Sequence, residues 1–91
     1  MIFKRRKFER ETVTDCTVEF VTSRWKSYGE VLDISEAGMR VYIDRTPEMH
    51  EAVQLNMTCG SGRSLNKKAI VIWFIKKVPP EVGAMVGMKF M

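Results

Sequence analysis

The chain has 91 residues, 45% of them hydrophobic, and a formal charge of +4. These values predict a single folded domain and exclude a largely disordered chain. The sequence has no apolar run long enough to cross a bilayer, and its charged N-terminal stretch lacks the apolar core of a signal peptide. We therefore expect a cytoplasmic protein without membrane insertion.

All of the excess positive charge lies in the first ten residues. Their only acidic residue is Glu9, and their five basic residues are Lys4, Arg5, Arg6, Lys7 and Arg10. The other 81 residues carry ten basic and ten acidic side chains and are neutral as a group. Charge concentrated in this way predicts an anion-binding arm rather than a surface that is basic throughout.

After this arm, several short runs of alternating apolar and polar residues predict strands, and a run over 69–75 predicts a strand that is apolar on both faces. No long helical pattern competes with them. The predicted strands cover residues 15–20, 28–34, 39–44, 53–59, 69–75 and 86–90. Turn-forming residues lie between them. Six strands at this spacing indicate an antiparallel barrel or sandwich, and a barrel suits a short chain because closure removes exposed strand edges.

Two motifs carry the chemistry: Arg6-x-x-x-Arg10 in the arm, and Asp33-x-Ser35-x-x-Gly38 at the end of a predicted strand. Guanidinium groups can donate two hydrogen bonds at once to guanine or to phosphate oxygens. A carboxylate accepts hydrogen bonds from guanine N–H groups, and glycine allows the backbone to approach a ligand closely. Together the two motifs predict a site for a guanine nucleotide.

With these motifs the chain resembles the PilZ domain, the bacterial receptor module for cyclic di-GMP. Residues 6–10 match its RxxxR element and residues 33–38 its [D/N]xSxxG element, while 69–73 and 86–90 are similar to its last two strands. The resemblance covers essentially the whole chain. It implies a six-stranded antiparallel β-barrel over residues 12–91, preceded by a flexible ligand-clasping arm over residues 1–11.

The resemblance also implies a role for each motif residue. Arg6 and Arg10 would clasp the ligand through guanine and phosphate. Asp33 would accept hydrogen bonds from a guanine edge, and Ser35 would bond to the same nucleotide. Gly38 would keep the turn tight and clear of the ligand.

Arg5 lies directly before the first motif, where an arginine in this family tends to accompany a stacked pair of ligands. A third guanidinium beside doubled phosphates is electrostatically reasonable. The implied function is that of a cyclic di-GMP receptor that passes the signal to an unidentified effector protein. Because the arm's cations repel one another, we expect the dianionic ligand to order residues 3–11 and so change the surface offered to that effector.

The sequence gives no sign of catalysis, metal binding or a cofactor. His50 is the only histidine, so it cannot form a metal site or a nucleophile–base pair with a second one. Cys16 and Cys59 lack a metal-binding spacing, and we expect both to be buried free thiols.

Two alternatives remain from the sequence. A small nucleic-acid-binding barrel could use the same arm on phosphates, although aromatic residues are not obviously interleaved with basic ones on a strand face. A ligand-independent adaptor is the other alternative, because some PilZ relatives have lost ligand binding. Those relatives typically lack one or both motifs, whereas this chain has both.

Overall fold

The computed structural model describes residues 11–12 and 15–91. Over these residues it consists of strands joined by turns and loops, and no helix in this part of the chain could span a membrane. The strands are β1 (Glu11–Thr12), β2 (Cys16–Val21), β3 (Lys26–Ile34), β4 (Gly38–Ile43), β5 (Ala52–Cys59), β6 (Ser64–Lys76) and β7 (Ala84–Phe90). The predicted arm lies outside the described residues except for its last position, Glu11, which begins β1.

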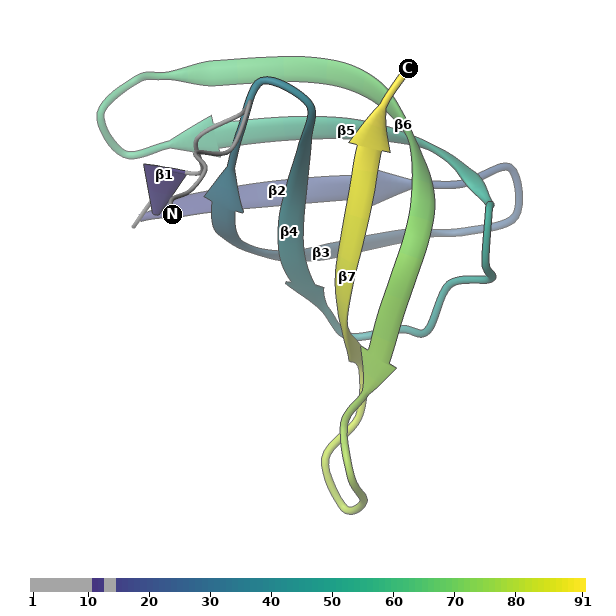
Figure 1. Cartoon of the computed structure of the whole chain (residues 1–91). Coiled ribbons are helices and arrows are strands. Elements are labelled where there is room, and N and C mark those ends of the chain that lie inside the picture. Colours follow the sequence, from purple (N-terminus) through teal and green to yellow (C-terminus); the bar gives the residue numbers. More distant parts are fainter. Residues whose placement is uncertain (1–10, 13–14) are drawn as a thin grey trace, which may run out of the picture.

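Six strands form a closed antiparallel barrel (Figure 1). Their order is β3-β2-β5-β6-β7-β4, and β4 pairs again with β3 to complete the circle. The short β1 adds to the end of β3, where Thr12 lies opposite Asp33. The structure therefore confirms the predicted six-stranded antiparallel β-barrel.

All six predicted strands are present, and the largest difference is at β6. A run of residues that is apolar on both faces predicted a strand from Ala69, but β6 begins at Ser64. The added residues are mostly exposed and polar, and they pair with β5 across a hairpin. Backbone pairing therefore extends β6 into a segment without an apolar pattern.

The inward-facing residues of the strands fill the barrel. Every second residue of β2 and β5 is buried, as expected for strands with one face on a core. The largest fully buried side chains are Phe20, Met39, Leu55, Met57, Val18, Val41, Val71 and Val86. Trp25 packs over one end of this core, with its ring 5.7 Å from that of Phe20 and nearly parallel to it.

Two irregularities in strand pairing change which residues face outward. In β3 the register shifts between Val31 and Asp33, so Asp33 pairs with Arg40. Directly opposite residues share a face of the sheet. Asp33 therefore shares the outer face with Arg40, although simple alternation from buried Val31 would have turned it inward. A similar shift after Val71 in β6 has the same effect on the residues that follow.

The prediction of two free thiols is wrong. Cys16 of β2 and Cys59 of β5 lie directly opposite each other and form a disulfide. Both residues are buried, as expected. The two cysteines are 43 residues apart, and only the pairing of β2 with β5 brings them together.

We expect reduction of this disulfide to lower the free energy of unfolding by about 2–4 kcal/mol, because the bond restricts the unfolded chain over a long loop. Urea unfolding with and without dithiothreitol measures the difference. The variant with both Cys16→Ser and Cys59→Ser is the control and should not respond to dithiothreitol. Two titratable thiols in the untreated folded protein would contradict the disulfide.

Candidate functional site

The second sequence motif forms the turn between β3 and β4. Ser35 Oγ accepts hydrogen bonds from the backbone N–H groups of Ala37 (3.3 Å) and Gly38 (3.2 Å). The Ser35 N–H donates to the Gly38 carbonyl oxygen at 2.8 Å. Ser35 is therefore buried within its own turn, which is a common role for serine at such positions. Its contact with a nucleotide stays a prediction.

Gly38 is required by the neighbouring strand. A Cβ atom at this position would overlap the carbonyl oxygen of Met88 in β7. The backbone of Phe90 also donates a hydrogen bond to the Ala37 carbonyl at 2.8 Å. The motif glycine thus allows the turn to pack directly against the end of β7.

Asp33 and Arg40 form an ion pair on the outer face of the barrel. Arg40 Nε donates to Asp33 Oδ2 at 2.8 Å, and Arg40 Nη2 donates to the same oxygen. Asp33 is only 5% exposed, whereas the Arg40 side chain is 41% exposed. Hydrogen bonding to Asp33 raises the pKa of Arg40 above its usual value. The pair thus holds a carboxylate and a guanidinium side by side, next to the Ser35–Gly38 turn.

A tryptophan extends this face across two more strands. Arg40 lies opposite Gly87 of β7, and Gly87 lies opposite Trp73 of β6. A Cβ at Gly87 would overlap the Trp73 ring, so the indole lies directly over the glycine. These residues, together with Ile72 and Met88, line a shallow depression of about 190 Å³. An acid, a guanidinium and an aromatic ring therefore follow one another across β3, β4, β7 and β6.

The structure brings together Asp33, Ser35 and Gly38, the three predicted residues of the second motif. The predicted arginines Arg5, Arg6 and Arg10 lie outside the described residues. Their part of the chain leads into β1, which pairs with β3 at Ile34 and Asp33. Among the described residues, no cluster of three or more His, Cys, Asp or Glu could hold a metal ion.

Sequence reasoning missed Arg40 and Trp73 as site residues. Arg40 could have been found, because it alternates with Met39 and Val41 and so faces away from the core. Trp73 could not, because alternation from Val71 turns it inward and only the register shift in β6 turns it outward.

A family model described as the PilZ domain matches residues 4–91. The chain therefore belongs to the PilZ domain family. No curated protein matches the sequence.

Two solved structures share the fold. The first is "PilZ domain with c-di-GMP of YcgR from Escherichia coli", with a TM-score of 0.72 and 15% identity, covering 97% of this chain and 79% of that chain. The second is a K. pneumonia MrkH complex with c-di-GMP, with a TM-score of 0.72 and 14% identity. That match covers 99% of this chain and 46% of the MrkH chain, so this chain spans about half of MrkH.

We expect Gly38→Ala to lower the free energy of unfolding by about 2 kcal/mol or more, because the added methyl group must displace the backbone of β7. Gly62→Ala is the matched control. Gly62 has a φ of 94° but has open space around its Cβ position, so it should cost only about 1–2 kcal/mol of backbone strain. Thermal unfolding of both variants makes the comparison, and a smaller loss for Gly38→Ala would contradict the packing argument.

Proposed function

We propose that the protein is a non-catalytic cyclic di-GMP receptor whose site combines the outer face at Asp33, Arg40 and Trp73 with the arginines of the N-terminal arm. The observation that carries the proposal is the Asp33–Arg40 pair beside the Ser35–Gly38 turn. Membership of the PilZ family supports it. So do the two similar structures, both of which are structures with c-di-GMP.

The chemistry of this face suits a ligand with two guanine bases and two phosphates. The Asp33 carboxylate can accept hydrogen bonds from a guanine edge, and its hydrogen bond from Arg40 holds it in orientation. Arg40 can also donate to a phosphate or to guanine O6 and N7. Trp73 is half-buried and lies flat against Gly87, so its other face can stack on a base.

The arm completes the site in this proposal. Arg10 is joined by a peptide bond to Glu11, the first residue of β1, and Glu11 lies opposite Ile34. In this proposal the arginines of the RxxxR motif contact the ligand from that side of the Asp33 face. Bound cyclic di-GMP offsets their mutual repulsion and orders residues 3–11, and the ordered arm presents a new surface to an effector protein in the cytoplasm.

Isothermal titration calorimetry with cyclic di-GMP tests the binding site. We expect saturable binding by the wild type, and a loss of at least about tenfold in affinity for Asp33→Ala and for Arg10→Ala, because each removes a charge-assisted contact. Arg45→Ala, at the other end of the barrel, is the matched control and should bind like the wild type. A wild type that gives no binding by calorimetry or by equilibrium dialysis would reject the receptor function and favour the adaptor.

The same titration reports the stoichiometry. Two ligands per chain would identify the stacked pair, and Arg5→Ala should then reduce the ratio to one because it removes the third guanidinium. One ligand per chain for the wild type would contradict the stacked pair that Arg5 implies. Equal binding of single-stranded DNA, with a steep salt dependence and no effect of Asp33→Ala, would instead support the nucleic-acid alternative.

Trp73→Leu should weaken cyclic di-GMP binding by about 5- to 30-fold, the loss of roughly 1–2 kcal/mol of stacking on one base. Trp73→Phe should keep most of the affinity because it retains an aromatic face. Circular dichroism checks that both variants are folded. Equal affinities for the leucine variant and the wild type would exclude Trp73 from the site.

A further inference from the structure

A second groove lies at the opposite end of the barrel from the Asp33 face. In the β4–β7 pair, Gly38 and Lys89 lie opposite each other at the end near Asp33, and Ile43 and Ala84 lie opposite each other at the groove end. The two ends are about 17 Å apart along the strands. The groove has a volume of about 600 Å³. Its walls are the β2–β3 turn, the segment that follows β4, and the β6–β7 hairpin, which projects from the barrel (Figure 1).

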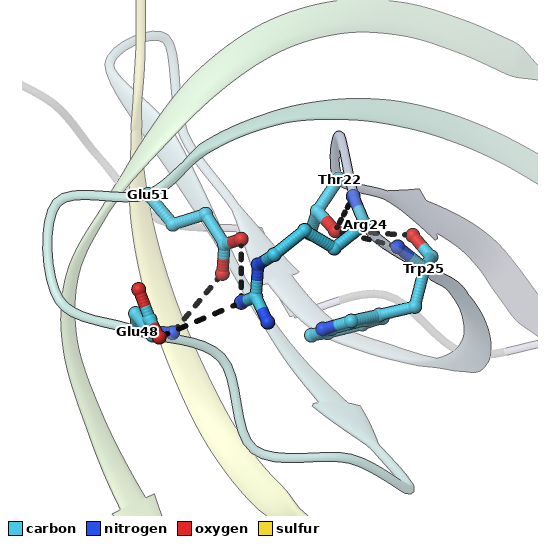
Figure 2. A network of polar contacts seen from close by, with 5 residues as sticks. All are labelled: Thr22, Arg24, Trp25, Glu48 and Glu51. Atoms are coloured by element: carbon cyan, nitrogen blue, oxygen red, sulfur yellow. Dashed lines mark hydrogen bonds and ion pairs between the residues drawn. The ribbon is translucent and has the colours of Figure 1, made fainter.

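The walls of the groove carry more positive than negative charge. The basic residues are Arg24, Arg45, Lys76 and Lys77, and the acidic residues are Asp44 and Glu81. Arg24 is paired with Glu51 at 2.9 Å and lies 3.8 Å from Glu48 (Figure 2). Asp44 accepts a hydrogen bond from Ser27.

The other three cations, Arg45, Lys76 and Lys77, line the same groove. Arg45 lies over the Trp25 ring at 4.8 Å, and Lys77 lies over the Tyr42 ring at 4.7 Å. Lys76 is exposed at the end of β6. Aromatic rings stabilise cations that lie over them, so Arg45 and Lys77 are held at the groove in position for an anionic partner.

The projecting hairpin also exposes large apolar side chains. Ile75 is 59% exposed, Val78 77% and Val82 72%. Hydrogen bonds from Lys77 N–H to the Gly83 carbonyl and from Glu81 N–H to the Val78 carbonyl order the loop that presents them. Apolar side chains gathered in this way on an ordered, projecting element are typical of a protein interaction surface.

Beside these residues, the barrel leaves a strand edge open. On its β5 side, β6 is paired with β5 only as far as Ile70, which lies opposite Ala52. Backbone hydrogen bonds between Val71 and the segment just before β5 are the last on this side. Among the described residues, β6 from Trp73 to Lys76 pairs only with β7. An open edge can accept a further strand through its backbone.

We propose that this end of the barrel is a docking site for an extended acidic segment of a partner protein, which adds as a strand to β6 along residues 72–76. Acidic side chains of that segment pair with Lys76, Lys77 and Arg45, and its apolar side chains contact Ile75, Val78 and Val82. The site is separate from the nucleotide site and does not depend on the proposed receptor function.

Charge complementarity favours this occupant over the others. A second copy of the chain would bring a groove with the same excess of positive charge. A nucleic acid would satisfy the cations but leave the strand edge unpaired and the exposed valines in water. Only an extended peptide with acidic and apolar side chains matches the cations, the edge and the apolar residues together.

The probe is a fluorescein-labelled peptide of about ten residues with alternating glutamate and valine, which suits the two faces of an added strand. We expect saturable binding by fluorescence anisotropy at micromolar concentrations. Amide signals of residues 72–77 and 45–46 should shift in NMR spectra of the whole protein. Combined Lys76→Glu and Lys77→Glu should weaken binding about tenfold or more because the charge is reversed.

Lys67→Glu with Lys68→Glu is the matched control, since these exposed lysines lie on the part of β6 that is paired with β5. It should leave peptide binding unchanged. A peptide methylated on alternate backbone nitrogens should bind much more weakly because it cannot donate to the strand edge. Equal binding of that peptide or of polyglutamate, equal effects of the two double variants, or no binding to the wild type would each overturn the proposal.

Two further measurements distinguish this docking site from a dimer interface and from the nucleotide site. Dimerisation of the wild type in sedimentation, abolished by Lys76→Glu with Lys77→Glu, would replace the peptide by a second copy and overturn the proposal. Peptide binding is measured without cyclic di-GMP, so a negative calorimetric titration with the nucleotide rejects the receptor function alone. A negative peptide titration beside positive nucleotide binding rejects the docking site alone.

Discussion

The pairing of β3 with β4 is the constraint on which the rest of the structure depends. It closes the barrel, so that the apolar inner faces of the strands pack against one another. Among the described residues, no helix is then needed to cover a face of the sheet. The same pairing contains the register shift before Asp33. Closure and the candidate site are therefore coupled, because the ladder that completes the barrel also turns a carboxylate outward next to Arg40.

The barrel separates two chemically different ends. At one end, the Ser35–Gly38 turn packs against the end of β7, and a nearly buried acid pairs with a guanidinium. At the other end, the β6–β7 hairpin extends beyond the barrel and carries exposed cations and aliphatic side chains. Strands β4 and β7 run from one end to the other. A small protein with this division can hold a ligand at one end without covering the surface available to a partner at the other.

The low identity to structures of the same fold has a physical explanation. A barrel of this kind needs apolar residues at inward positions, and many combinations of similar volume satisfy that need. Close contacts at glycines tolerate fewer substitutions. The Met88 carbonyl lies directly against Gly38, and the Trp73 ring lies directly against Gly87. Two residues with such specific requirements, Gly38 and Gly87, lie at the candidate site.

The sequence by itself determined the fold class, because strand alternation and turn residues are local properties of the chain. It also located the Asp33–Gly38 motif, since a serine or glycine in a tight turn acts within a few residues. It did not determine the disulfide, because the register of β2 against β5 joins residues 43 apart. Nor could the outward orientation of Trp73 be predicted from the sequence, because it depends on a register shift of β6 relative to β7. Only the tertiary structure decides such features, since they arise from pairing between strands.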